Sequence, residues 1–180
     1  MRSNLPSSGA HVFWTLLFMV SGCSAPQTVE TADSRRVALV LSDAERIKPG
    51  LSDRSAVMSA FGNADLETNL EGMGQIAWLY LEGTHRATRL SIVFKGDVVD
   101  SVTWFVNDSD PETKLPLAKK RYSAASFKVR PRPGTNPHAV PDEDIYSDEK
   151  LGLTIVHART PDRVNSISWR KSQRQLATEK

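Results

Sequence analysis

The sequence predicts an α+β fold, in which short helices pack on antiparallel β-sheet as two tandem helix–β-hairpin units. Three observations predict this class. Apolar and polar residues alternate in two segments, as in hairpins with one buried face. Capping and terminating residues mark short helices ahead of these segments. The two segments also share one pattern, which indicates an internal repeat.

The first 22 residues have the parts of a secretory signal peptide. Arg2 supplies a positive charge, Val12 to Val20 form a short apolar stretch, and small residues follow in the run Val20-Ser21-Gly22-Cys23. The nine-residue stretch is too short for a membrane span, which needs about 20 residues. We therefore expect residues 1–22 to be a signal peptide.

The same run resembles the lipobox of bacterial lipoproteins. The resemblance implies that Cys23, the only cysteine, is acylated and becomes the first residue of the mature chain. Two or more acyl chains anchor a protein stably in a membrane. The alternative is an ordinary signal peptide with an incidental cysteine nearby. Ser24 follows the cysteine where an Asp marks inner-membrane retention in Gram-negative lipoproteins. The resemblance thus favours the periplasmic face of the cell outer membrane over the inner membrane.

Residues 23–41 are predicted to be the lipidated N-terminus and a tether, because residues 24–35 are polar and lack periodicity. A first α+β unit is predicted over 42–107. Its first helix starts at the capping box Ser42-x-x-Glu45 and ends at Pro49-Gly50. Ser52 caps a second helix that carries an apolar stripe and ends at Gly62. A strand over 76–82 and a hairpin over 90–104 complete the unit.

A second α+β unit is predicted over 108–172. It contains a helix over 111–124, a strand over 126–130, a proline-rich loop and a hairpin over 153–169, and a polar tail, 173–180, follows it. The hairpins of the two units align: residues 90–94 match 153–157 at an offset of 63, and residues 99–104 match 164–169 at an offset of 65. Trp104 and Trp169 are equivalent in this alignment and are predicted to be core anchors.

The sequence contains no pattern typical of an enzyme. No two of the four histidines have metal-ligand spacing, and there is no Gly-x-Ser-x-Gly motif or second thiol. His157 is predicted to lie in a strand at the sheet's edge, and the acidic cluster Asp142-Glu143-Asp144 is predicted to be solvated. The formal net charge of +2 gives no reason to expect a nucleic-acid partner. We expect no catalysis, cofactor, metal or small-molecule substrate.

One stretch is basic without an intervening acidic residue. A solvated surface is one interpretation, and contact with an anionic surface such as lipid headgroups or peptidoglycan carboxylates is the other. The residues of this stretch are Lys119, Lys120, Arg121, Lys128, Arg130 and Arg132.

A family resemblance covers residues 42–105 and extends to the lipobox. The motifs are the run 47–52, the positions Val57, Phe61 and Gly62, the aromatic run 78–80 and the hairpin 90–98. They are similar to the SmpA/OmlA (BamE-like) family of outer-membrane lipoproteins, which implies two helices against a three-stranded antiparallel sheet. The tandem arrangement also resembles β-lactamase inhibitory protein. The chain departs from the single-unit family in its second half.

The resemblance implies a non-catalytic protein-interaction or scaffold module, held at the membrane by a lipid anchor, with a protein partner in envelope or outer-membrane protein assembly. The alternative is an inhibitor-like protein that captures a periplasmic enzyme with its sheet surface.

Overall fold

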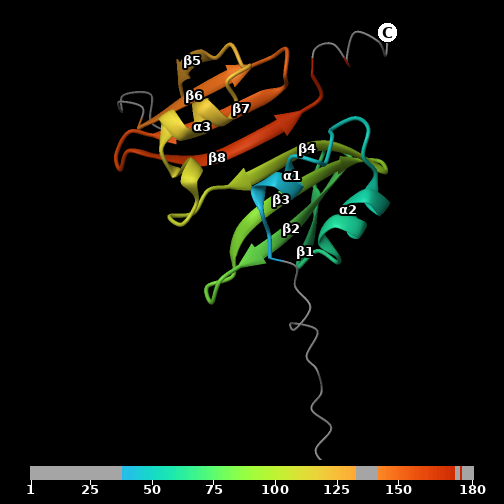
Figure 1. Cartoon of the computed structure of the whole chain (residues 1–180). Coiled ribbons are helices and arrows are strands. Elements are labelled where there is room, and N and C mark those ends of the chain that lie inside the picture. Colours follow the sequence, from blue (N-terminus) through green and yellow to red (C-terminus); the bar gives the residue numbers. More distant parts are fainter. Residues whose placement is uncertain (1–37, 133–141, 173–174, 176–180) are drawn as a thin grey trace, which may run out of the picture. The chain divides into compact units, whose positions relative to one another are not determined.

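Eight strands form one continuous antiparallel sheet in the computed structural model, which describes residues 38–132, 142–172 and 175 (Figure 1). Their spatial order is β1-β2-β3-β4-β8-β7-β6-β5, so β1 and β5 are the edge strands. The strands are β1 (Leu66–Leu70), β2 (Gln75–Glu82), β3 (Ala87–Lys95), β4 (Val98–Phe105), β5 (Lys128–Pro131), β6 (Glu143–Asp148), β7 (Leu153–Ala158) and β8 (Arg163–Arg170).

The predicted fold class is wrong, because the chain is mostly one sheet rather than helices packed on tandem sheets. Strands β4 and β8 pair along residues 101–105 and 166–170 and so join the two predicted hairpins. The described helices are few and short: α1 (Leu41–Ala44), α2 (Arg54–Phe61), the 3₁₀ turn η2 (Pro111–Thr113) and α3 (Leu115–Arg121). The single helix predicted over 111–124 is therefore split, and strands β1 and β6 were not predicted.

The register shows that the sequence repeat relates the two halves of this sheet. Trp104 lies opposite Ile167, and its counterpart Trp169 lies opposite Val102. The pairing of β4 with β8 is therefore symmetric about Thr103 and Ser168, which lie opposite each other. Both hairpins also have a register shift at the same place, between Val93/Phe94 and between Val156/His157. The second turn is two residues longer, which explains the change of offset from 63 to 65.

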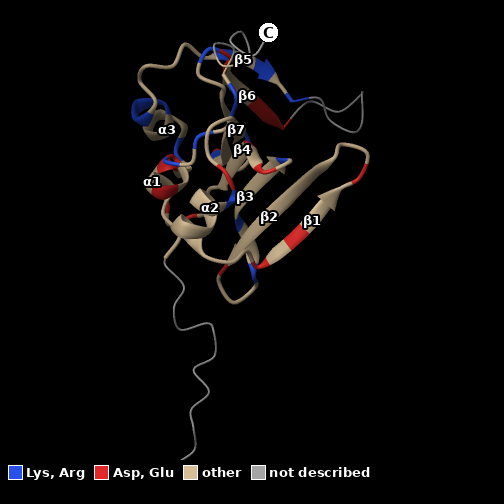
Figure 2. Cartoon of the chain, turned by 90° about the vertical axis from the view of Figure 1, so that its right-hand side faces the viewer, with Lys and Arg blue, Asp and Glu red and all other residues tan. Residues whose placement is uncertain are grey.

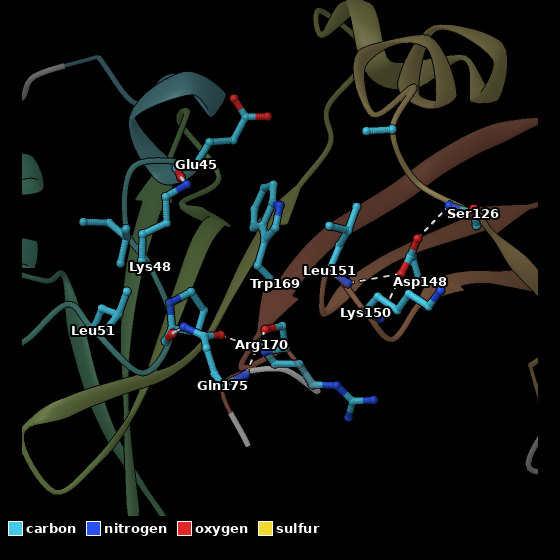
Figure 3. Close-up of a pocket in the computed structure, with 14 residues that line it drawn as sticks. Glu45, Lys48, Leu51, Ser126, Asp148, Lys150, Leu151, Trp169, Arg170 and Gln175 are labelled. Atoms are coloured by element: carbon cyan, nitrogen blue, oxygen red, sulfur yellow. Dashed lines mark hydrogen bonds between the residues drawn. The ribbon is translucent and has the colours of Figure 1, made fainter. Parts of the chain in front are cut away.

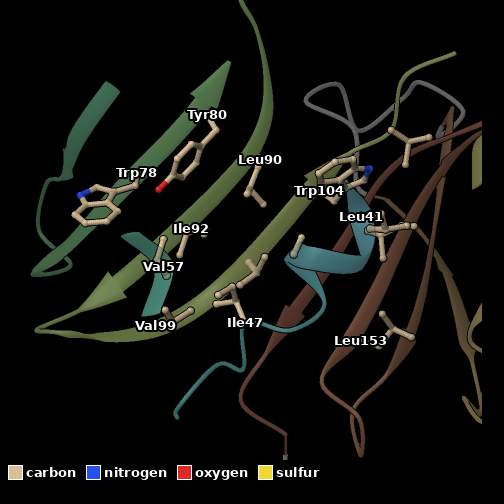
Figure 4. Close-up of a cluster of buried hydrophobic side chains, with 14 of the residues drawn as sticks. Leu41, Ile47, Val57, Trp78, Tyr80, Leu90, Ile92, Val99, Trp104 and Leu153 are labelled. Atoms are coloured by element: carbon tan, nitrogen blue, oxygen red, sulfur yellow. The ribbon is translucent and has the colours of Figure 1, made fainter. Parts of the chain in front are cut away.

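One face of the sheet carries the hydrophobic core, shown in Figure 4. Trp104, Phe94 and Ile167 are almost fully buried on it, and Leu41, Val57 and Ala118 bring α1, α2 and α3 onto the same face. Every residue of this core lies between positions 39 and 169, inside the compact unit Arg35–Lys180. That unit therefore holds its whole core and is expected to fold without residues 1–34.

The helix boundaries follow different caps from those predicted. Helix α1 has no side-chain cap, since its N-cap residue is Val40 rather than Ser42, and Glu45 lies at its C-cap with the carboxylate bound by Arg121. Asp53 caps α2 by accepting a hydrogen bond from the Ala56 backbone N–H at 2.8 Å, whereas the Ser52 hydroxyl accepts from Lys48 N–H. Gly62 ends α2 as predicted, with a φ of +73° that favours glycine.

No helix in the described part of the chain has both the length and the apolar character that a membrane-crossing segment needs.

Candidate functional site

The two equivalent tryptophans have different surroundings, and this difference creates a pocket. Trp104 is 1% exposed. The Arg89 guanidinium lies 4.0 Å from the centre of its ring, held by ion pairs to Glu82 and Asp110. Trp169 is only half-buried. At the offset of 63, Gly152 takes the position of Arg89. In the strand register, Asp148 takes the position of Tyr80, because Asp148 lies opposite Leu153 as Tyr80 lies opposite Leu90. The second half therefore lacks the guanidinium that covers Trp104 and has a smaller, polar residue in place of Tyr80.

A pocket of about 560 Å³ lies at Trp169 and is lined by both halves of the chain. We call it the Trp169 pocket (Figure 3). Glu45 and Lys48 stand on one side of the indole ring in that view, and Leu151 stands on the other. The lining residues are Glu45, Ile47, Lys48, Pro49, Leu51, Ala124, Ser126, Asp148, Lys150, Leu151, Trp169, Arg170, Ser172 and Gln175. The volume is within the range of about 300–1,000 Å³ that is typical of small-ligand sites.

The Glu45 carboxylate at this pocket is already bound. Arg121 donates to it from Nε at 2.8 Å and from Nη2 at 2.7 Å, and the Tyr122 hydroxyl donates at 2.7 Å. Burial opposes the ionisation of Glu45, but these hydrogen bonds outweigh it, so the pKa of Glu45 lies below its ordinary value. Burial and the neighbouring carboxylate both raise the pKa of Tyr122. Glu45 is thus an ionised, neutralised group.

The second carboxylate, Asp148, is also bound. It accepts backbone N–H groups from Ser126 at 2.6 Å, Lys150 at 2.9 Å and Leu151 at 3.1 Å. The Ser126 N–H, followed by the other two, holds the pKa of Asp148 below its usual value despite burial. Asp148 therefore joins the turn after β6 to the segment that precedes β5, and the two form one wall of the pocket.

Replacing Asp148 with Asn is expected to destabilise the protein at neutral pH, because an amide oxygen accepts these N–H groups less strongly than a carboxylate. A carboxyl group whose pKa is lowered by folding stabilises the protein at pH values above its pKa in the unfolded state, which is about 3.9. This contribution is lost as the pH falls through the lower pKa of the folded state. Urea unfolding at pH 7 and at pH 3 should show a difference between wild type and Asp148→Asn that shrinks in acid. An equal difference at both pH values would contradict this role.

The opposite face of the sheet carries short hydroxyl side chains and no described helix. Ser91, Thr103 and Ser168 lie side by side across β3, β4 and β8, and the row continues through Thr154 and Ser147 on β7 and β6. All five are half-buried. The described helices pack on the core face. We call this side the hydroxyl face.

The basic residues singled out in the sequence lie on both faces of the sheet. Lys119 on α3 lies 4.1 Å from the Tyr146 ring centre, on the core side. Lys128 and Arg130 lie opposite Ser147 and Ile145 and so belong to the hydroxyl face. Figure 2 shows the Lys and Arg positions on α3 and on β5 as separate segments of the ribbon. They do not form one patch.

Two of these basic residues are paired with acids. Arg121 binds Glu45 and Glu112, and Arg132 binds Glu143 at 2.8 Å. Lys120 is exposed on α3, and no ion pair of Lys120 is found within the described residues. Cys23 lies outside the described residues, so its acylation stays a prediction.

The acidic cluster and His157 have structural contacts. Asp144 pairs with Arg159 and Glu143 pairs with Arg132, so two of the three acids predicted to be solvated are in ion pairs. His157 is on β7, an interior strand, and not at the sheet's edge. It is 7% exposed, and its Nε2 lies 2.6 Å from Asp162 Oδ1. The described residues include no group of His, Cys, Asp or Glu arranged to hold a metal ion.

The comparisons with known proteins do not assign a family. No family model and no curated protein matches the chain. The chain is similar in structure to a DUF4309 family protein (YjgB) from Bacillus subtilis, with a TM-score of 0.47, 14% identity and coverage of 72% of this chain and 85% of that chain. It is also similar to a cysteine-rich secretory protein (SAV1118) from Staphylococcus aureus, with a TM-score of 0.39, 15% identity and coverage of 70% of this chain and 45% of that chain. TM-scores below 0.5 carry no functional conclusion. The resemblance to the SmpA/OmlA family thus stays a prediction.

Proposed function

We propose that this protein is a lipid-anchored, non-catalytic binding module at the periplasmic face of the outer membrane, and that its hydroxyl face contacts a protein partner in envelope assembly. The lipobox-like run ending at Cys23 supports the anchor and the compartment. The hydroxyl face is the observation that carries the interaction, because it is a broad side of the sheet on which no described helix packs.

The size of the hydroxyl face fits a protein partner. Eight strands spaced about 4.8 Å apart give a width of about 34 Å, and strands of about six residues give a length of about 20 Å. The resulting area of roughly 680 Å² is close to the roughly 800 Å² that each partner buries in a standard interface. Short Ser and Thr side chains let a partner approach closely. Leu66 on the edge strand β1 and Phe105 at the end of β4, which are 50% and 38% exposed, supply apolar contacts.

The substitution Thr103→Arg tests this surface, because Thr103 lies at the centre of the hydroxyl face. A long cation there should prevent close contact and lower the recovery of crosslinked partner from intact envelopes about tenfold or more, since interface centres exclude charge. The protein should still fold, because Thr103 is half-buried on the side away from the core. Recovery is measured by affinity capture of the full chain followed by mass spectrometry.

Met73→Arg is the matched control, since Met73 is 68% exposed in the turn between β1 and β2. It should leave the capture unchanged. Equal recovery with Thr103→Arg and with wild type would show that the hydroxyl face is not the interface. Recovery of one soluble hydrolase in place of outer-membrane assembly subunits would support the inhibitor-like alternative, which uses the same sheet surface.

A further inference from the structure

We propose that the Trp169 pocket binds a carboxylate-bearing saccharide, by stacking one sugar ring on the indole and pairing the carboxylate with Lys48. This site lies on the core side of the sheet and is separate from the hydroxyl face. The proposal therefore goes beyond the proposed protein contact and can fail or succeed independently of it.

The charges of the pocket select an anion. Glu45 is neutralised by Arg121, and Asp148 is bound by three backbone N–H groups. Lys48 is exposed and uses one N–H on the carbonyl oxygen of Glu45, at 2.5 Å. Because an ammonium group has three donors, Lys48 keeps two for a ligand. Lys150 and Arg170 are exposed cations at the rim, although the Arg170 guanidinium points away from Trp169 in Figure 3.

The shape and lining of the pocket favour a sugar over an acyl chain. Leu51 and Leu151, two of its apolar lining residues, are 76% and 49% exposed, so the pocket is open to water. An acyl chain binds well only where its methylene groups are removed from water. A sugar ring instead covers an aromatic surface with its apolar face and keeps its hydroxyl groups in water or near polar side chains. Ser126, Ser172 and Gln175 make the wall polar, and the Gln175 amide is held there by hydrogen bonds from Ser172 N–H and to the Pro49 carbonyl.

The backbone at the pocket disfavours an extended peptide. Peptides that add to a sheet need an edge strand with free N–H and C=O groups. None of the lining residues belongs to the edge strands β1 or β5. The N–H groups of Ser126, Lys150 and Leu151 are occupied by Asp148, and the carbonyl of Pro49 accepts the Gln175 amide at 3.0 Å.

Calorimetric titration of the unit 35–180 with tetragalacturonate tests the proposal, with the neutral cellotetraose as the matched ligand. We expect the acidic tetrasaccharide to bind more tightly than the neutral one, and the binding to weaken as salt is added. Lys48→Gln and Trp169→Leu should each weaken binding about tenfold or more, the loss expected for a charge-assisted hydrogen bond or a stacking surface. Lys120→Gln, which changes another exposed lysine, on α3 and outside the pocket, should leave binding unchanged.

A folding readout separates loss of the site from loss of the fold. Leu151→Ser changes an exposed residue in the wall of the pocket and should also weaken binding. It replaces Trp169→Leu in the test if that variant does not fold. The proposal is overturned if tetragalacturonate does not bind at millimolar concentration, if cellotetraose binds equally well, or if Lys48→Gln and Leu151→Ser bind like wild type. Tighter binding of phosphatidylglycerol vesicles or of a hexaglutamate peptide at the same residues would also overturn it.

Discussion

Trp104→Ala is expected to destabilise the protein by about 3–5 kcal/mol, as found for large aromatic residues removed from a core. Its side chain is 1% exposed, its Nε1 donates to Asp110 at 3.3 Å, and Arg89 covers its ring. Removing the indole leaves a cavity beneath a buried guanidinium. Since a domain of this size is stable by only about 5–15 kcal/mol, the loss is a large part of the total. Chemical denaturation of the unit 35–180 measures it.

Trp169→Ala is the matched comparison, because the two residues are equivalent in the repeat. The Trp169 ring already borders the pocket, so we expect a smaller loss of about 1–2 kcal/mol, in proportion to the apolar area that it buries. Equal losses at both positions would show that the missing counterparts of Arg89 and Tyr80 do not change the burial of Trp169. The origin given for the pocket would then be incorrect.

The hairpins could be predicted from the sequence because their signals are local. Apolar and polar residues alternate along Leu90–Phe94 and Val99–Trp104, and a turn that contains a glycine separates the two segments. This pattern predicts both the strands and their pairing. The second hairpin follows from the same pattern. Strand β1, Leu66–Leu70, could not be predicted in this way, because its side chains are largely polar and exposed as expected for a short edge strand.

The joining of the halves into one sheet could not be predicted, because it depends on contacts between residues about 65 positions apart. The pairing of Thr103 with Ser168 places two small hydroxyl residues together, and nothing local distinguishes them from surface residues. The capping box predicted at Ser42 and Glu45 was wrong for a related reason. Glu45 fits a capping box locally, but Arg121 and Tyr122 from the other half bind its carboxylate in the folded chain.

The repeat alone could have shown that the surroundings of Trp169 differ from those of Trp104. Aligning the halves gives Gly152 the position that Arg89 has in the first half. A glycine at the position of a large side chain indicates empty space or close backbone approach. Here the close approach applies: Gly152 has a φ of +67°, and an added Cβ would overlap the Arg170 carbonyl oxygen. The equivalence of the tryptophans was predicted, but the comparison of their neighbours requires the strand register.

Replacing Cys23 with Ala is expected to abolish lipid attachment completely. Acylation of this kind forms a thioether with the cysteine sulfur, and Cys23 is the only cysteine in the chain. Cells grown with a clickable fatty-acid analogue should therefore label the wild-type protein and leave the variant unlabelled. The variant should also remain as a precursor that contains residues 1–22, or it should appear in the soluble fraction. The soluble fraction is expected because the apolar stretch of nine residues is too short to span a membrane.

Ser24→Ala is the control, since it changes the next residue and keeps the thiol, and it should be labelled like wild type. Label retained on Cys23→Ala would show that the acyl group is attached elsewhere, and absence of label on wild type would favour an ordinary signal peptide with an incidental cysteine. In either case the anchor part of the proposed function would be wrong. The hydroxyl face and the Trp169 pocket would be unaffected, because both are built entirely by residues after position 38.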